Sequence, residues 1–323
     1  MSFNIGAGEV LGLVGESGSG KSTVGKCIMR LLDPTSGTIT LNGKDITRLS
    51  RKQLRPLRRD VHMVFQDPYS SLNPRMTTGQ IVGEPLRLQG IARGNDLDDR
   101  VKTLFEKVGL APQMRERYPH ELSGGQRQRV GIARALSLEP SLLIADEPIS
   151  ALDVSVQAAI INLLMDLQQD MGFSCLFITH DLSAVEFISN RIAVMYLGRI
   201  VELAPRKELF AEPKMPYTQA LLSAVLAPDP GLQRTRQRIL LEGDIPSPIH
   251  PPTGCKFHTR CPLAEEVCAA EEPPLADVTG RGHLALCHFI GPNGEAPDAS
   301  APGDPAARHR TGTGRTSDVH HQT

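Results

Sequence analysis

The chain carries near its start the octapeptide Gly15-Glu16-Ser17-Gly18-Ser19-Gly20-Lys21-Ser22, which is followed by Thr23. This octapeptide has the spacing G-x-x-x-x-G-K-[ST] of a phosphate-binding loop. An apolar run typical of a buried strand, residues 9–14, precedes it, and residues 24–32 continue with helical character up to Pro34. A strand, a glycine-rich turn and a helix N-terminus together direct backbone N–H groups at a bound phosphate. The sequence therefore predicts a nucleotide site.

The residue types of this loop, which we call the phosphate loop (residues 15–22), indicate how a triphosphate is held. Lys21 is expected to reach the β- and γ-phosphates, and the Ser22 hydroxyl is expected to bind Mg²⁺. Asp146 follows a predicted buried strand and provides a second, acidic Mg²⁺ ligand. Glu147 comes next and is suited to act as the general base for an attacking water. These residues predict a hydrolytic site.

A second glycine-containing turn, residues 122–126, precedes an arginine-bearing helix. Its glycines and the helix N-terminus form another phosphate-binding surface. A single chain rarely surrounds one triphosphate with two such turns, so we expect this turn to face a nucleotide that another chain holds. Taken alone, the pentapeptide is equally explained as a helix cap after a flexible turn.

The order of the predicted elements indicates an α/β fold with a mainly parallel sheet. Strands are predicted at residues 38–41, 61–65, 141–145 and 175–179, a hairpin at 192–203, and helices between 77 and 136. Strands that alternate with helices are typical of such a sheet. We predict a nucleotide-binding domain at residues 1–227 with a helical subdomain at about 70–136. A small irregular C-terminal extension (residues 228–290) and a disordered tail (residues 291–323) follow.

Composition excludes several classes of protein. The 323 residues carry a net charge of −1, only 4% aromatic residues and no Trp, which argues against a nucleic-acid partner. The cations of residues 48–59 are interpreted as a solvated face. No apolar run approaches the ~20 residues of a membrane span, and the N-terminus lacks signal-peptide features. These observations predict a cytosolic protein.

Taken together, the motifs resemble those of the ATP-binding cassette (ABC) family. The stretches that carry the resemblance are the phosphate loop, Gln66 after a strand, residues 122–126, Asp146-Glu147, residues 150–153 and His180 at a strand end. The resemblance covers roughly residues 3–225. More narrowly, residues 64–75, 117–122 and 246–262 are similar to the ATPase subunits of oligopeptide and dipeptide importers.

The resemblance implies that two ATPase subunits close head to tail over two ATP molecules. It implies that Gln66 contacts Mg²⁺ and the attacking water, that His180 holds the γ-phosphate, and that Glu147 is the catalytic base. The implied Mg²⁺ ligands are Ser22, Gln66 and Asp146. The implied nucleotide-binding residues are Gly15, Glu16, Ser17, Gly18, Ser19, Gly20, Lys21, Ser22 and Thr23. Ser123, Gly124, Gly125 and Gln126 are implied to complete the partner's site, and Asp153 to link the two sites.

The resemblance further implies a bacterial subunit on the cytoplasmic face of the cell membrane that powers peptide import with two permeases and an external binding protein. A soluble ABC protein of translation or DNA repair is the rival interpretation, but those proteins usually carry tandem cassettes or a coiled-coil insertion. A non-hydrolysing regulator is disfavoured by Glu147 and His180.

The family also carries an upstream strand and an aromatic residue that stacks on adenine. Only 14 residues precede Gly15 here, and Phe3 aligns with a core position. Either the start is assigned too late or adenine is held differently.

Four cysteines crowd into the extension with spacings C-x₅-C-x₆-C-x₁₈-C. They are Cys255, Cys261, Cys268 and Cys287. A cytosolic location argues against disulfides, and the pairs C-x₂₋₄-C of zinc ribbons are missing. Three alternatives remain: a [4Fe–4S] cluster, which some importers of the resembled group carry in this segment, Zn²⁺ with His258, His283 or His288 as spare ligands, and plain thiols. A metal centre here would be a structural staple.

Overall fold

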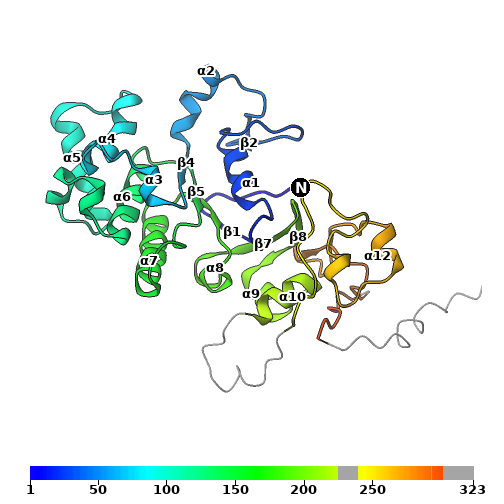
Figure 1. Cartoon of the computed structure of the whole chain (residues 1–323). Coiled ribbons are helices and arrows are strands. Elements are labelled where there is room, and N and C mark those ends of the chain that lie inside the picture. The colour runs from blue at the N-terminus through cyan, green and yellow to red at the C-terminus, as the bar shows by residue number, and fades with distance from the viewer. Residues whose placement is uncertain (225–238, 292, 301–323) are drawn as a thin grey trace, which may run out of the picture.

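An eight-stranded sheet forms the centre of the computed structural model, which describes residues 1–224, 239–291 and 293–300 (Figure 1). The strands follow the order β4-β5-β6-β1-β7-β8-β10-β9. Their bounds are β1 Val10–Val14, β4 Val61–Val64, β5 Leu142–Asp146, β6 Ser174–Ile178, β7 Arg191–Tyr196, β8 Arg199–Pro205, β9 Ala276–Asp277 and β10 Leu284–Ala285. The strands from β4 to β7 pair in parallel, and β7, β8, β10 and β9 pair antiparallel. The predicted mainly parallel sheet is confirmed.

Helices cover both faces of this sheet, which explains why its central strands are continuous apolar runs. Every residue of β1 is buried. On one face lies α1 (Lys21–Ile28), and on the other lie α7 (Val154–Met171), α8 (Leu182–Ile188), α9 (Arg206–Ala211) and α10 (Pro216–Ser223). The apolar face of α7 packs into the core through Ile160, Leu164 and Leu167, which are buried.

A helical lobe is inserted between β4 and β5 and lies at one end of the molecule (Figure 1). It consists of α3 (Pro68–Ser71), α4 (Thr78–Leu88), α5 (Gly94–Lys107), η2 (Pro112–Glu116), η3 (Pro119–Glu121) and α6 (Gly124–Leu136). Capping boxes at Thr77 and Ser123 fix the starts of α4 and α6. Ile81, Phe105 and Val130 bury the apolar faces of its helices against one another. The lobe occupies the range predicted for the helical subdomain.

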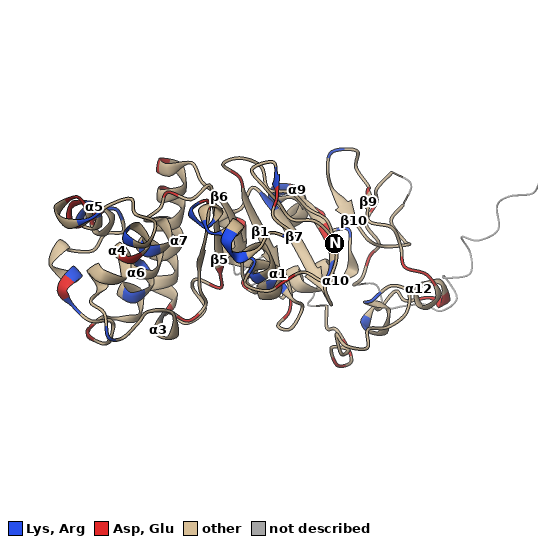
Figure 2. Ribbon diagram, turned by 90° about the horizontal axis from the view of Figure 1, so that it is seen from above, with Lys and Arg blue, Asp and Glu red and all other residues tan. Residues whose placement is uncertain are grey.

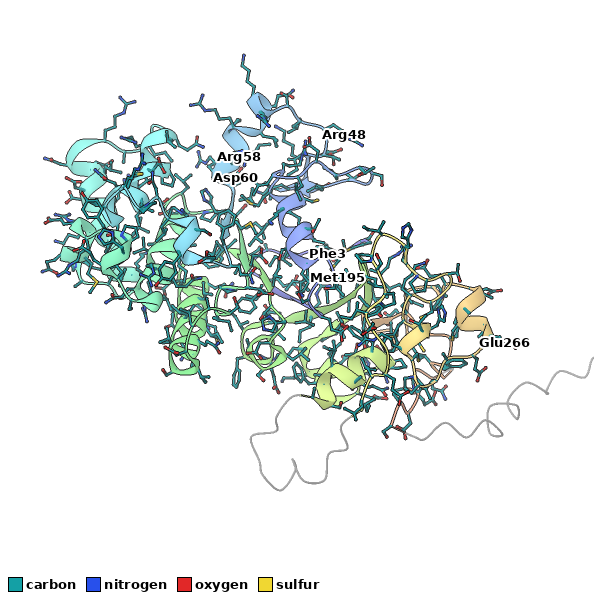
Figure 3. All side chains as sticks on the ribbon, in the orientation of Figure 1. Phe3, Arg48, Arg58, Asp60, Met195 and Glu266 are labelled. Atoms are coloured by element: carbon teal, nitrogen blue, oxygen red, sulfur yellow. The ribbon has the colours of Figure 1, made fainter. Side chains whose placement is uncertain are left out.

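A smaller segment between α1 and β4 lies beside α1. It contains the strand pair β2 (Thr40–Leu41) and β3 (Lys44–Asp45), the helix α2 (Arg51–Leu54) and the turn η1 (Pro56–Arg59). Its cations include Arg48 and Arg58, which Figure 3 labels. Figure 2 shows Lys and Arg on other segments of the described chain as well. Of the six cations at residues 48–59, Arg58 is half-buried and the others are exposed, as expected of a solvated face.

The extension contains η4 (His258–Arg260) and α12 (Glu266–Ala270), and it also lengthens the central sheet. Leu284 of β10 pairs with Leu203 of β8, an edge strand that would otherwise present unpaired backbone groups. Sequence analysis predicted only an irregular segment here and missed these two strands, which are two residues long and carry no alternating pattern.

The prediction of a disordered tail is wrong for its first residues. The Gln219 side chain on α10 donates a hydrogen bond to the Pro297 carbonyl (2.7 Å) and accepts one from the Ala299 N–H (3.0 Å). Ala299 is buried. A glutamine amide thus holds two backbone groups in place, so this stretch needs no large apolar side chain. The remainder of the predicted tail, residues 301–323, lies outside the described residues.

No helix in the described ranges combines the length and the apolar character that are needed to cross a bilayer.

Candidate nucleotide site

The phosphate loop joins β1 to α1, as predicted, and its glycines are required by its geometry. Gly15 has φ 153°, and a Cβ there would lie 2.2 Å from the Met195 carbonyl oxygen of β7. Gly20, the N-cap of α1, is left-handed with φ 102°. Figure 3 shows Phe3 near Met195. Both side chains pack in the same apolar cluster as the buried face of α1, so Phe3 occupies the predicted core position.

Lys21 is buried in the middle of this loop. Its Nζ donates hydrogen bonds to the carbonyl oxygens of Gly15 (2.7 Å) and Glu16 (2.9 Å). Burial lowers the pKa of Lys21, and the carboxylates of Glu147, Asp146 and Glu16 act in the opposite direction. The ammonium is therefore held by weak neutral acceptors, for which phosphate oxygens are a stronger substitute.

Ser22 and Asp146 meet at the predicted Mg²⁺ position. The Ser22 Oγ donates a hydrogen bond to Asp146 Oδ1 at 2.9 Å. Burial raises the pKa of Asp146, the hydrogen bond from Ser22 lowers it, and the nearby Glu147 raises it further. A hydroxyl beside a buried carboxylate is an all-oxygen donor pair of the kind that Mg²⁺ prefers. These two residues therefore fit the ion. Thr23 is exposed next to them.

Gln66, Glu147 and His180 form a contiguous group beyond the carboxyl ends of β4, β5 and β6. The Gln66 Nε2 donates to Glu147 Oε2 at 2.8 Å, and His180 Nδ1 lies 3.3 Å from Glu147 Oε1. The parallel pairing of neighbouring strands brings these side chains to one edge of the sheet, next to the phosphate loop that follows β1. The three residues predicted to be catalytic are thus brought together.

Glu147 has a strained backbone. Its φ of 45° is in the left-handed region, and its N–H donates to the Ile178 carbonyl of β6 at 2.8 Å. Such a conformation costs on the order of 1–3 kcal/mol for a residue other than glycine and is found most often at functional sites. With the backbone in this conformation, the carboxylate extends beyond the carboxyl end of β5 and contacts Gln66 and His180.

The turn at residues 123–126 lies elsewhere on the chain. Ser123 caps α6, accepting a hydrogen bond from the Gln126 N–H (3.3 Å), and Gln126 Oε1 accepts one from the Ser123 N–H (2.9 Å). Gly124 and Gly125 begin the helix. Both Figure 1 and Figure 2 place α6 in the helical lobe, apart from α1. Asp153 is the N-cap residue of α7, and its side chain makes no capping hydrogen bond.

Two residues of the site were missed by sequence reasoning. The Glu16 N–H donates to the Tyr217 hydroxyl of α10 at 3.0 Å, and the Arg260 guanidinium of the extension donates to both Glu16 carboxylate oxygens (2.7 and 3.1 Å). Arg260 belongs to a stretch that carried the family resemblance. No local pattern, however, connects it with a loop 244 residues earlier in the chain.

The four cysteines of the extension are free thiols. Burial raises the pKa of Cys261 to about 12 and that of Cys287 to about 11, and the neighbouring cysteines add to both shifts. Among residues 1–224, 239–291 and 293–300, no group of three or more His, Cys, Asp or Glu is placed to hold a metal ion. As arranged, the thiols do not fit a metal centre, so the predicted [4Fe–4S] or Zn²⁺ site is not supported.

The histidines considered as spare zinc ligands are engaged in hydrogen bonds instead. His283 Nε2 lies 2.7 Å from Glu202 Oε1 of β8, and both side chains are buried. His258 Nδ1 lies 2.8 Å from the Cys255 carbonyl, and His288 Nε2 lies 3.1 Å from the Glu271 carbonyl.

Comparison with known proteins agrees with this geometry. A family model described as ABC transporter matches residues 1–150, and one described as the C-terminal region of oligopeptide/dipeptide transporters matches residues 201–268. A probable peptide ABC transporter ATP-binding protein of Sinorhizobium fredii is 55% identical over 95% of this chain and 85% of its own length. The oligopeptide transport ATP-binding protein OppF of Haemophilus influenzae is 50% identical over 89% of this chain and 86% of its own length.

Two solved structures share the fold. An ATP-binding cassette captured as a dimer in a post-hydrolysis state with ADP and Pi is 32% identical, with a TM-score of 0.58, over 63% of this chain and 88% of that one. The cbiO1 protein of Clostridium perfringens, part of the ABC transporter complex cbiONQ, is 34% identical, with a TM-score of 0.60, over 66% of this chain and 83% of that one.

Proposed function

This chain belongs to the ABC transporter family as an ATPase subunit, and we propose that it hydrolyses ATP to drive the import of di- or oligopeptides across a bacterial membrane. The observation that carries the proposal is the convergence of three groups at the carboxyl ends of the parallel strands. These groups are Lys21 in the phosphate loop, the Ser22–Asp146 oxygen pair, and Glu147 with its partners Gln66 and His180.

In the proposed reaction each of these groups has one step. Backbone N–H groups of the phosphate loop and the Lys21 ammonium would bind the β- and γ-phosphates. Ser22 and Asp146 would hold Mg²⁺, with Gln66 as the further proposed ligand, and the charge of the ion would offset that of the phosphates. Glu147 would take a proton from the attacking water, and its hydrogen bond from Gln66 fixes the orientation of the carboxylate. His180, within 3.3 Å of Glu147, would hold the γ-phosphate.

We further propose that each site is completed by a second ATPase subunit in a head-to-tail dimer. The separation of α6, whose N-terminus carries the turn at residues 123–126, from α1 supports this arrangement, because the turn then lies apart from the phosphate loop of its own chain. Asp153, without a capping bond, is free to contact the partner. One of the similar solved structures is a dimer with ADP and Pi.

The peptide substrate is inferred from the relatives. The names of the relatives from Sinorhizobium fredii and Haemophilus influenzae refer to peptide or oligopeptide transport, and the second family model covers part of the extension. In this proposal the chain acts together with two permease subunits and an external binding protein. It would bind the cytoplasmic face of the permeases. No described feature of the chain itself selects a peptide.

The test is transport by the complete complex. Permeases, the wild-type chain and its partner ATPase are reconstituted in vesicles, and ATP-dependent accumulation of a labelled peptide is measured with the binding protein present. We expect uptake that disappears when Lys21→Ala replaces the wild-type chain. ATP hydrolysis without uptake of any di- or oligopeptide would contradict the assigned substrate, and absence of ATP hydrolysis would contradict the whole proposal.

The metal centre in the extension is a separate proposal that rests on the cysteine spacing and on the mutual influence of the thiols on their pKa values. It requires the four thiols to form a ligand group, which the described residues do not form as arranged. Iron, sulfide and zinc analysis of anaerobically purified protein tests it. About four irons or one zinc per chain, lost in Cys261→Ser, would support it, and metal-free protein would overturn it.

A further inference from the structure

An ion pair links the extension directly to the phosphate loop. The Arg260 guanidinium donates to both carboxylate oxygens of Glu16, at 2.7 and 3.1 Å, the paired geometry in which Arg binds a carboxylate most strongly. The Arg260 side chain is only 7% exposed and that of Glu16 is 24% exposed. Screening by solvent is therefore weaker than for an ion pair on the surface.

The surroundings of Arg260 keep it in this position. Phe257 of the extension is fully buried and packs against Tyr196 of β7 and Tyr217 of α10, with ring centroids 5.4 and 5.3 Å apart. The Arg260 guanidinium lies 6.0 Å from the centre of the Tyr196 ring. The hydrogen bonds to Glu16 raise the pKa of Arg260, so it is always cationic. The aromatic group thus fixes the segment that carries the cation.

Glu16 places a negative charge where a triphosphate would bind. It occupies the second position of the phosphate loop, and its own carbonyl oxygen accepts a hydrogen bond from the Lys21 ammonium. An unpaired carboxylate at this position would repel the phosphates and compete with them for Lys21. Arg260 cancels that charge, and the Tyr217 hydroxyl anchors the Glu16 backbone.

We propose that Arg260 is a positioning residue through which the extension sets the ATP affinity of the phosphate loop, by neutralising and orienting Glu16. The inference rests on the proposed function, because it concerns the same nucleotide site. It gives the extension a direct influence on nucleotide binding, so that any event that loosens the segment around Arg260 lowers the affinity for ATP.

The experiment is a charge-rescue cycle with ATP binding and turnover as readouts. We expect Arg260→Ala to raise the Kd for ATP roughly tenfold at low salt, with the defect in the KM for ATP and not in kcat. Glu16→Gln should bind ATP more tightly than wild type, because Arg260 is then left unpaired near the phosphates. The double variant should recover most of the affinity that Arg260→Ala loses. High salt should narrow the difference between Arg260→Ala and wild type.

Glu272→Gln is the matched control, since it removes another ion pair between the extension and the sheet, Arg199–Glu272, which is exposed. It should leave ATP affinity unchanged. A merely structural role for Arg260 predicts no rescue by Glu16→Gln, and this result would overturn the inference, as would unchanged affinity in Arg260→Ala. Wild-type protein that binds no ATP would instead overturn the proposed function. The melting temperature of each variant is measured as well, so that a loss of ATP affinity caused by unfolding is recognised.

Discussion

Glu147→Gln separates nucleotide binding from hydrolysis more cleanly than any other single change in this chain. The amide has the size of the carboxylate, and neither residue relieves the backbone strain at φ 45°, so the fold should be little affected. Phosphate contacts through Lys21 and the Ser22–Asp146 pair do not involve this side chain. What is lost is the ability to take a proton from water.

The size of the effect follows from the role of Glu147 as a general base. A general base contributes typically about 10²–10⁴ in rate, or roughly 3–5 kcal/mol in activation free energy. The amide oxygen can still accept the hydrogen bond from Gln66, and the amide N–H can face His180, so the side chain keeps its place. We therefore expect a loss in kcat within that range, with the Kd for ATP changed less than about threefold.

The assay is phosphate release at saturating ATP and Mg²⁺ in the presence of the partner subunits, beside binding of a fluorescent ATP analogue. Gln66→Ala provides the comparison, because it removes the orienting hydrogen bond but keeps the base, and should cost less than Glu147→Gln. If Glu147→Gln keeps kcat within about threefold of wild type, Glu147 is not the base and the assignment of the group is refuted.

Three further predictions concern pH and packing. Burial, with a smaller effect of Arg134, lowers the pKa of His62 to about 4. The contribution of His62 to stability is present above the unfolded pKa of about 6.5 and is lost as the pH falls toward 4, so the free energies of urea unfolding at pH 7 and 4.5 should differ by up to about 3 kcal/mol more in wild type than in His62→Gln. Because burial raises the pKa of Asp146, the Mg²⁺ concentration for half-maximal hydrolysis should increase as the pH falls, and a requirement independent of pH would contradict this. Leu164→Ala, at a site 2% exposed, should lower the free energy of unfolding by about 2–5 kcal/mol, whereas Val154→Ala on the same helix, 81% exposed, should change it by less than about 0.5 kcal/mol.

The parts of this site that sequence reasoning located are those defined by short-range chemistry. The phosphate loop is local in sequence, and Asp146, Glu147 and His180 each end an apolar run that is recognisable as a buried strand. Parallel pairing then brings these strand ends together without further information.

What could not be predicted depends on contacts between distant segments. The bond between Arg260 and Glu16 has no signature in either local sequence, and neither has the Gln219 amide that holds Pro297 and Ala299. The spacing of the four cysteines indicated a metal centre, yet the structure places them as free thiols, two buried and two half-buried, that form no ligand group with other described residues. Spacing limits where ligands can lie, but only packing decides whether they converge.

The central claim is that each ATP is bound by the phosphate loop of one chain and closed over by Ser123 of another. It is tested most directly by mixing two inactive variants, Lys21→Ala and Ser123→Arg, and measuring ATP turnover. In a head-to-tail dimer of this chain, a mixed pair combines both defects in one site and leaves the other site intact.

Each variant alone should be nearly inactive, and an equal mixture should recover up to about one quarter of wild-type turnover, since half of the randomly formed dimers have one intact site of two. If the chain pairs with a different ATPase subunit, Ser123→Arg should abolish turnover at the partner's phosphate loop and spare its own. Full turnover at both sites by the Ser123→Arg chain would show that the turn at residues 123–126 serves no nucleotide in the partner and would contradict the account.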